Sequence, residues 1–250
     1  MLDLDDVGLT AYFDDQFDNS NPEFWRRMGK RPDVAGRRVI DLGSGVGAMS
    51  VELAQHGADV LGIELHEERV SFAQRHASAR FPQMPGRVEF RNADLAALEE
   101  RDAFDFVFSK DTFEHVEDMQ GMLSFLAGVL RPGGEIWTGF SPMWFSPNGD
   151  HGLTDSRLPW AHLLYPRPRV LQRMTVKTGR TITSLEDVDL NGMSPSQFRQ
   201  YVTEAGLEIS QVRYNAGDKV GLRAMNVARR LPGLERFFTA GIYAIIRRPM

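Results

Sequence analysis

Short apolar runs alternate with helical stretches along residues 36–140, and this alternation restricts the possible fold more than any other feature of the chain. The apolar runs predict strands at 38–42, 58–64, 87–92, 104–109 and 135–140. Helices are predicted between them at 48–56, 67–80 and 116–130, with a short helical turn at 95–99. Strands that alternate with helices form βαβ units, which build a parallel sheet with helices on both faces. The sequence therefore predicts an α/β protein.

The alternation stops after Phe140 and resumes at Ser194. Residues 141–192 carry five of the thirteen prolines and two of the four tryptophans, Trp144 and Trp160. About fifty irregular residues inside a compact domain usually form a lid or a binding segment. We therefore expect an irregular insertion on the substrate side.

The two ends of the chain complete the predicted organisation. After the insertion, Ser194 and Pro195 are typical of a helix N-terminus, and the segments that follow are expected to be a strand at 207–214, a helical stretch at 220–238 and a strand at 241–247. Residues 1–35 are expected to be an acidic, irregular tail with one helix at 22–29. This leaves 36–250 as one domain.

A glycine-rich loop follows the first predicted strand. The segment Val39–Gly47 reads Val-Ile-Asp-Leu-Gly-Ser-Gly-Val-Gly and leads directly into a helix. Glycines at this place let the backbone turn sharply and let a nucleotide approach it closely. Glu64 ends the next strand, where its carboxylate can accept hydrogen bonds from ribose hydroxyls. The loop also fits the dinucleotide pattern Gly-x-Gly-x-x-Ala, so by itself it indicates only an adenosine cofactor.

Three further features identify the kind of cofactor. Asp41 directly precedes the loop, where a carboxylate suits an ammonium group better than a pyrophosphate. Asp94 follows the third strand, within reach of an adenine amino group, and a turn at 130–134 (Leu-Arg-Pro-Gly-Gly) precedes the fifth strand. With these residues the chain resembles the class I S-adenosylmethionine-dependent methyltransferases, over 37–140 and again over 194–247.

The resemblance implies a fold and a cofactor site. The fold is a Rossmann-like, doubly wound sheet of seven strands in the order 3-2-1-4-5-7-6, with the last strand antiparallel and the insertion after strand 5. S-adenosylmethionine is the implied cofactor, and S-adenosylhomocysteine is its product. The implied cofactor-binding residues are Asp41, Gly43, Ser44 and Gly45 for the methionine part, Glu64 for the ribose, Leu65, Ala93 and Asp94 for the adenine, and Ser109 and Lys110 beside the sulfonium. Lys110 departs from the small or acidic residue that the family pattern has there. Asp94 could instead cap a helix.

Methyl transfer depends mainly on alignment, but an oxygen or nitrogen nucleophile must also lose a proton, so a nearby base helps. His115 follows the fourth strand, at the sheet edge where doubly wound folds bind ligands, although the resemblance gives the pair Glu114-His115 a chiefly structural role. Asp111 is a second candidate base. His151 and His162, both in the insertion, could hydrogen-bond the substrate or only hold the loop together; no metal site is predicted, because their spacing matches no ligand pattern. The other three histidines are interpreted as surface residues.

Composition excludes several classes of protein. The 250 residues contain no cysteine, which excludes disulfides, thiol nucleophiles and cysteine-ligated metal centres. A net charge of -5 lacks the basic footprint of a nucleic-acid-binding protein, and residues 109–112 (Ser-Lys-Asp-Thr) lack the Asn/Asp-Pro-Pro-Tyr segment of nucleic-acid methyltransferases. The longest apolar run, 237–246, is shorter than the roughly 20 residues of a membrane span, and the acidic start differs from a signal peptide. We therefore expect a cytoplasmic protein.

Charge is distributed unevenly along the chain. Residues 1–140 have 14 basic and 25 acidic side chains, whereas residues 141–250 have 15 basic and 9 acidic ones. The range 156–185 contains no acid and six basic residues, which are Arg157, Arg167, Arg169, Arg173, Lys177 and Arg180. This is either a solvated face or a site for an anion, so one hypothesis is a small-molecule acceptor with an apolar or aromatic body and an anionic group. An acceptor carried by an acidic protein and a homodimer are compatible with the same residues.

Two other functions stay open on the sequence alone. A nicotinamide-dependent oxidoreductase would use the same loop on a similar sheet, and a relative that has lost catalysis would still bind a cofactor. The predicted function is methylation of a small molecule at oxygen or nitrogen.

Overall fold

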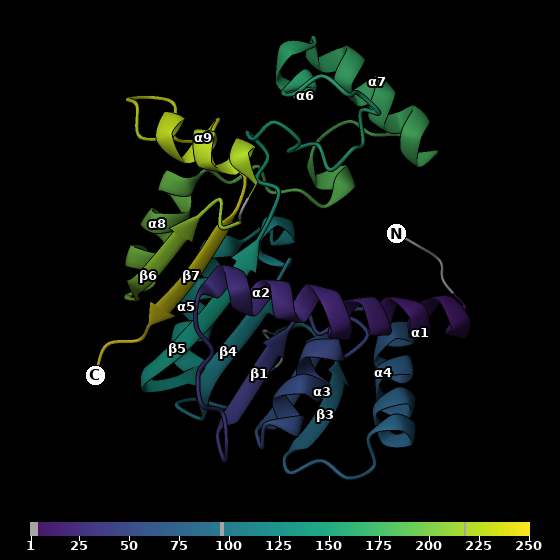
Figure 1. Cartoon of the computed structure of the whole chain (residues 1–250), viewed down its shortest axis with the longest axis vertical. Coiled ribbons are helices and arrows are strands. Elements are labelled where there is room, and N and C mark those ends of the chain that lie inside the picture. The colour runs from purple at the N-terminus through teal and green to yellow at the C-terminus, as the bar shows by residue number, and fades with distance from the viewer. Residues whose placement is uncertain (1–4, 96–97, 218) are drawn as a thin grey trace.

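The described residues form a seven-stranded sheet that runs through the centre of the molecule (Figure 1). In this computed structural model, residues 5–95, 98–217 and 219–250 are described. The strands are β1 (Arg38–Leu42), β2 (Asp59–Glu64), β3 (Arg87–Asn92), β4 (Phe104–Lys110), β5 (Leu130–Phe140), β6 (Glu208–Tyr214) and β7 (Ile242–Arg247). Their order is β3-β2-β1-β4-β5-β7-β6, and only β7 runs antiparallel to its neighbours. The predicted strand order and the antiparallel last strand are confirmed.

Helices cover both faces of this sheet. They are α1 (Asp6–Asp15), α2 (Asn21–Met28), α3 (Ala48–Gln55), α4 (Glu67–Arg80), α5 (Met119–Val129), α6 (Ala161–Leu164), α7 (Arg167–Thr178), α8 (Pro195–Glu204) and α9 (Val220–Ala228). Within the described ranges, none of them is both long and apolar enough to cross a lipid bilayer. The predicted helices at 48–56, 67–80 and after Ser194 are confirmed within a few residues, and Ser194 with Gln197 forms the capping box of α8.

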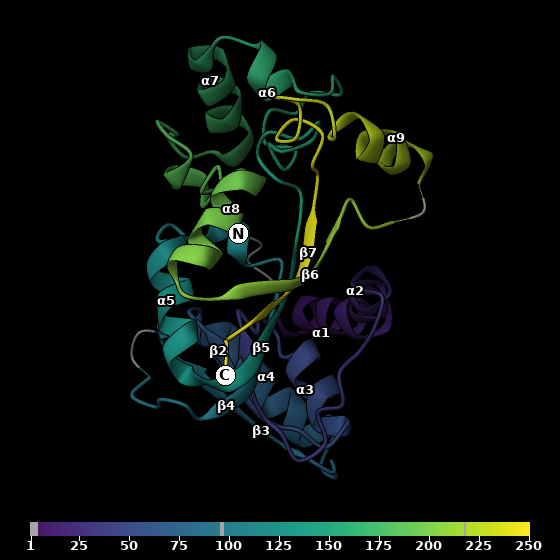
Figure 2. The same ribbon diagram turned by 90° about the vertical axis from the view of Figure 1, so that its left-hand side faces the viewer.

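Strand periodicity divides the core into layers. In β1, Val39 packs into the cluster that contains Met49 and Leu53 of α3, whereas the next residue, Ile40, packs into the cluster of Leu123 in α5. Successive side chains of a strand point to opposite faces, so both faces of β1 are buried. Figure 2 shows α5 and α8 on one side of the sheet and α1 to α3 on the other. The central strands therefore place their carboxyl ends at one buried edge, where ligands bind in such sheets.

The N-terminal segment differs from its prediction. Instead of an irregular tail, residues 6–15 form α1, and a π-helical turn, η1 (Gln16–Ser20), continues it into α2. Asp5 caps α1 by accepting a hydrogen bond from the Gly8 amide. Phe13 is 1% exposed and packs beside Phe90 and Ala73. Contacts with distant residues therefore stabilise a helix that has little local signal.

The insertion is also more ordered than predicted. Residues 141–192 contain α6, the twelve-residue α7 and a 3-10 turn, η4 (Glu186–Val188). Pro168 lies in the first turn of α7, where the missing N–H removes no intrahelical bond. Val170, Met174 and Ile182 form a small core of their own. Three of the five prolines that suggested irregular chain, Pro159, Pro166 and Pro168, thus lie at the starts of short helices.

Smaller differences concern element ends. The helix expected from residue 116 begins at Met119, because Asp118 caps it through the Gly121 amide and a 3-10 turn, η3 (Phe113–His115), precedes it. The turn expected at 130–134 is a bulge inside β5, since Phe104 pairs with Leu130 but Phe106 already pairs with Glu135. The helix expected to reach residue 238 ends at Ala228. Part of the helical turn expected at 95–99, residues 96 and 97, lies outside the described residues.

Candidate active site

A cavity of about 1010 Å³ opens at the carboxyl ends of β1, β2 and β4. Residues of α1 and η1 line it from above, and Val188 and Asp189 of the insertion line its far side. The predicted site residues that line it are Asp41, Gly43, Ser44, Gly45, Glu64, Leu65, Ala93, Asp94, Lys110, Asp111 and His115. The cavity therefore brings together eleven residues that are dispersed over 75 positions of the sequence.

The glycine loop has the backbone that its sequence predicts. Gly43 and Gly45 have φ values of 73° and 54°, which other residues rarely adopt. A Cβ at Gly43 would lie 2.4 Å from Oγ1 of Thr112, whereas a Cβ at Gly45 would have no atom within 4 Å. The backbone at Gly45 thus borders open space, as a loop that cradles a ligand requires. Ser44 beside it is 8% exposed, and its Oγ has no hydrogen-bond partner among the described residues.

Glu64 holds this loop in place. Its Oε2 accepts a hydrogen bond from the Gly45 amide at 3.0 Å, and its Oε1 accepts one from the His66 amide at 3.0 Å. Each carboxylate oxygen can accept a second hydrogen bond. The carboxylate is therefore fixed in orientation and can still receive ligand hydroxyls. The adjoining Leu65 is 69% exposed, an apolar side chain at the cavity wall.

Asp41 is a buried carboxyl group at the end of β1. It is 2% exposed, and its Oδ2 accepts a hydrogen bond from Ser50 Oγ at 2.5 Å. Burial raises the pKa of Asp41 from 3.8 to about 6, and the nearby Lys110 opposes this rise. A buried carboxylate of this kind is stabilised by a cationic ligand group.

Lys110 joins the sheet to the N-terminal helices. Its Nζ donates hydrogen bonds to Gln16 Oε1 at 2.7 Å, Ser20 Oγ at 3.1 Å and Asn21 Oδ1 at 2.6 Å. Burial lowers the pKa of Lys110 to about 8, although Asp111 and Asp41 oppose this. The departure from the family pattern at this position thus has a structural use, since the lysine anchors η1 above the cavity.

Asp111 and His115 line the cavity from the segment that follows β4. Asp111 has a φ of 51°, and burial raises its pKa. His115 Nδ1 lies 2.5 Å from the carbonyl oxygen of Asp189. Because a carbonyl can only accept, Nδ1 carries the proton, which leaves Nε2 as a potential proton acceptor. The insertion therefore fixes the tautomer of the predicted base.

The remaining predicted site residues do not line the cavity. Ser109 is fully buried in β4, with its Oγ unpartnered among the described residues. His151 lies close by, with its ring 5.9 Å from that of His115, and it hydrogen-bonds the carbonyl of Pro142. His162 is 5% exposed and donates to the carbonyl of Trp144. These contacts support a structural role for His162.

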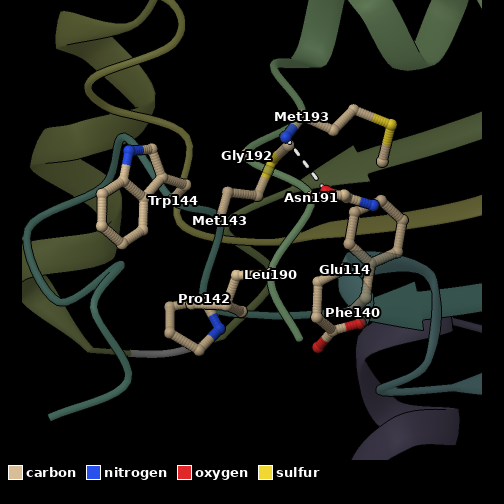
Figure 3. Close-up of a pocket in the computed structure, with 9 residues that line it drawn as sticks. All are labelled: Glu114, Phe140, Pro142, Met143, Trp144, Leu190, Asn191, Gly192 and Met193. Carbon is tan, nitrogen blue, oxygen red and sulfur yellow. Dashed lines mark hydrogen bonds between the residues drawn. The ribbon is translucent and has the colours of Figure 1, made fainter. Parts of the chain in front are cut away.

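A second hollow adjoins the cavity wall, with room for about one water molecule (about 10 Å³). Figure 3 shows it between Pro142–Trp144 and Leu190–Met193, the two ends of the insertion. Glu114 borders it, 5% exposed and with Oε2 unpartnered in the described structure. Burial and the nearby Asp111 raise the pKa of Glu114 well above its ordinary value. Asn191 Nδ2 donates hydrogen bonds to the carbonyls of Phe113 and Val116, which flank Glu114-His115. These bonds anchor the insertion to η3.

Sequence reasoning missed several residues of the cavity. Tyr12 and Gln16 come from the helix that was predicted as irregular tail, and Arg69 comes from the first turn of α4. His66 was interpreted as a surface residue, but it lines the cavity next to Glu64. Its position two residues after Glu64, just past the end of β2, was the one available signal.

Comparison with known proteins agrees with this geometry. Residues 40–138, which include the glycine loop, Glu64, Asp94 and His115, match a family model described as a methyltransferase domain. Residues 40–138 thus have the sequence pattern of a methyltransferase domain. This agrees with the family that the sequence motifs predicted.

Two relatives and one solved structure illustrate the extent of the similarity. Ubiquinone biosynthesis O-methyltransferases from Xanthomonas oryzae and Coxiella burnetii are 37% and 30% identical over 117 and 118 residues, which is 47% of this chain in each case. These alignments cover 48% and 49% of the relatives, so the chain matches about half the length of each. An S-adenosylmethionine-dependent methyltransferase from Mesorhizobium loti is 22% identical with a TM-score of 0.58, and the match covers 91% of this chain and 96% of that one. At this identity the structural match establishes the fold alone.

Proposed function

We propose that the protein transfers a methyl group from S-adenosylmethionine to an oxygen or nitrogen atom of a small molecule. The observation that carries this proposal is one cavity that the glycine loop, Glu64 and His115 all line. The loop and Glu64 have the groups that an adenosine cofactor needs, and His115 is a base for an acceptor.

The residues present fit the cofactor that the family implies. S-adenosylmethionine supplies an electrophilic methyl group on a sulfonium. Asp41 would hold its ammonium group, and the unpartnered Oγ of Ser44 and the open backbone at Gly45 would receive its methionine part. Glu64 would accept from the ribose hydroxyls, and the exposed Leu65 would pack on the adenine. Ala93 and Asp94 line the same end of the cavity and would bind the adenine edge.

His115 is the proposed proton acceptor for the substrate. Its Nδ1–H is directed to the Asp189 carbonyl, so Nε2 can accept a proton from a hydroxyl or amine. Asp111 lines the same cavity and can stabilise the imidazolium that results. The name of the two curated relatives, which are O-methyltransferases, favours oxygen as the methylated atom.

Charge in the cavity favours an acceptor that is neutral or cationic near its reacting atom. Seven carboxyl groups line the cavity, which are Asp41, Glu64, Asp94, Asp111, Glu117, Asp118 and Asp189. Lys110 and Arg69 are the only lysine and arginine among its described lining residues. None of the six basic residues of the insertion is among them, so the hypothesis of an anionic acceptor has no support from this cavity. An anionic group could be accommodated only in a part of the acceptor that extends outside the cavity.

Two measurements test the proposal. Calorimetric titration with S-adenosylhomocysteine and with NADH should give binding of the former alone, and the reverse would favour the oxidoreductase. Methyl transfer to a panel of hydroxyl- and amine-bearing small molecules should then detect turnover. Binding without turnover on any class of acceptor would favour the non-catalytic relative.

A variant of His115 tests the role of the base. His115→Gln should lower kcat by roughly a hundredfold, within the usual range for a lost acid–base group, and leave the affinity for S-adenosylhomocysteine unchanged. His56→Gln is the matched control, because His56 Nδ1 also contacts a backbone carbonyl, that of Glu52, but His56 is absent from the cavity lining. Equal kcat in both variants would exclude His115 as the base.

A further inference from the structure

The helix α9 has apolar residues on its outward side as well as on its inward side. No residue of α9 is buried, although Val220, Val227 and Ala224 make one of its faces apolar. Val220 and Val227 are 81% and 69% exposed, and Leu231, one turn beyond Val227, is 56% exposed. On the opposite face, Leu222 and Met225 are half-buried, and the half-buried Asn226 accepts a hydrogen bond from Asn215. A surface helix normally directs its apolar face to the core, so the outward face of α9 fits an environment other than water.

Basic side chains border this apolar face. Residues at spacings of three and four share one side of a helix, which places Arg223 beside Val220 and Val227. Lys219 precedes the helix, Arg230 follows it, and none of the described carboxylates forms an ion pair with these three cations. We define the α9 face as Val220, Ala224, Val227 and Leu231 together with Lys219, Arg223 and Arg230.

We propose that the α9 face docks on an anionic lipid surface. A helix with an apolar face and basic flanks lies in the interface plane of a membrane, with its apolar residues among the acyl chains and its cations among anionic headgroups. The α9 face has both components on one short element that the rest of the fold leaves uncovered. The two views agree that α9 lies at the end of the molecule occupied by α6 and α7, away from β3 (Figures 1 and 2).

The neighbouring insertion also exposes apolar and basic side chains. Leu164 and Val176, on α6 and α7, are 65% and 78% exposed, and Arg167 and Arg169 are exposed beside them in the sequence. The insertion is attached to the segment after α9, because Trp160 Nε1 donates to the carbonyl of Phe237. The proposed surface therefore belongs to a joined region of the molecule.

Charge and residue type favour lipid over a protein partner. A two-fold contact between two copies through this face would bring Arg223 and Arg230 close to their counterparts, which is repulsive. Stable protein interfaces depend mainly on tryptophan, tyrosine and arginine anchors, whereas valine and leucine contribute few of the strongest contacts. The exposed apolar residues of the α9 face are valine, alanine and leucine.

Vesicle binding of the whole chain tests the proposal. The protein should float with vesicles of mixed phosphatidylcholine and phosphatidylglycerol, should not float with phosphatidylcholine alone, and should be released as salt is raised. Val220→Ser/Val227→Ser should reduce the partition coefficient at least tenfold. Arg223→Gln/Arg230→Gln should reduce it by roughly five- to twentyfold, since each cation near an anionic leaflet contributes severalfold. Val7→Ser/Arg87→Gln, with exposed residues on α1 and β3, is the matched control and should bind as the wild type does.

Three results would overturn the proposal. The first is no binding to anionic vesicles at low salt, and the second is binding that both α9 variants retain. The third is a concentration-dependent dimer, or a complex with an acidic carrier protein, that the same variants abolish while vesicles bind no variant. Affinity for S-adenosylhomocysteine, measured on every variant, reports folding and cofactor binding separately, so failure of the lipid proposal and failure of the methyltransferase proposal give different results.

Discussion

Replacement of Asp41 by asparagine gives a quantitative test of the cofactor site. In the free protein, deprotonation of this carboxyl group is unfavourable, because burial raises its pKa from 3.8 to about 6. This rise corresponds to roughly 3 kcal/mol of free energy. The group is 2% exposed, so solvent screens little of this penalty.

The sign of the pH dependence follows from the raised pKa. Between about pH 4 and pH 6, the folded chain binds more protons at Asp41 than the unfolded chain does, so the free energy of unfolding falls as the pH rises through this range. Asp41→Asn removes the free-energy cost of deprotonating this buried carboxyl group. The free variant should therefore unfold at a higher urea concentration than the wild type at pH 7.5, with a gain of at most about 3 kcal/mol.

Cofactor binding should respond in the opposite direction. The ammonium group of S-adenosylhomocysteine favours the carboxylate form, so wild-type affinity should be constant well above pH 6 and fall about fivefold from pH 6 to pH 5. Asp41→Asn should bind weakly throughout and lose this slope. A slope caused by any other group that lines the cavity would persist in the variant.

Calorimetry across about pH 5 to 7.5, with circular dichroism to verify the fold, measures both effects. Asp59→Asn is the control, because Asp59 begins β2 at the opposite sheet edge and is largely exposed. Wild-type affinity that does not change over this pH range, in folded protein, would refute the assignment of Asp41 to the ammonium group.

Other predictions concern separate parts of the fold. Glu64→Gln should weaken S-adenosylhomocysteine binding by about ten- to a hundredfold, since it removes the charge from an acceptor that also holds the glycine loop; unchanged calorimetric affinity would contradict the ribose site. Lys110→Met should accelerate amide hydrogen exchange in the N-terminal helices, because three side-chain oxygens lose their donor, and exchange at the wild-type rate would mean that the lysine does not anchor them. Ser194→Ala should lower the free energy of unfolding by about 1 kcal/mol, measured in urea, through loss of the α8 cap. Arg167→Gln/Arg169→Gln should leave the acceptor KM unchanged, and an increased KM would support an anionic acceptor after all.

The central sheet and the cofactor side of the cavity were predictable because their rules are local. Strands buried on both faces appear as short apolar runs, and the loop after β1 needs glycine wherever φ is positive, as at Gly43 and Gly45. The role of Glu64 was predicted from its place at the end of the next strand, β2. These residues depend on their neighbours in sequence, so the pattern contains the information.

The N-terminal helix and the insertion were not predictable in the same way. The Phe13 ring lies tilted against that of His76, with 4.5 Å between the ring centroids, and Asp14 forms an ion pair with Arg80. Contacts with α4 therefore stabilise α1 more than its own periodicity does. In the insertion, Pro168 indicated a break but lies in the first turn of a helix. Local propensity is a weak guide where packing between distant segments decides the outcome.

Lys110 is a residue whose position was visible in the sequence but whose hydrogen-bond partners were not. In the sequence it was a departure from the family pattern without an explanation, because a buried cation requires hydrogen-bond acceptors and those that Lys110 uses are not near it in the chain. In the structure its partners are 94, 90 and 89 residues away, on the helical segment 16–21 that precedes the helix predicted at 22–29 and was predicted as irregular. With its pKa near 8, this lysine is mostly protonated at neutral pH, so its three neutral acceptors and the adjacent carboxylates are needed to keep it folded inward. A buried charge without a local partner therefore indicates that a distant segment must cover it, and here that segment also forms the roof of the cavity.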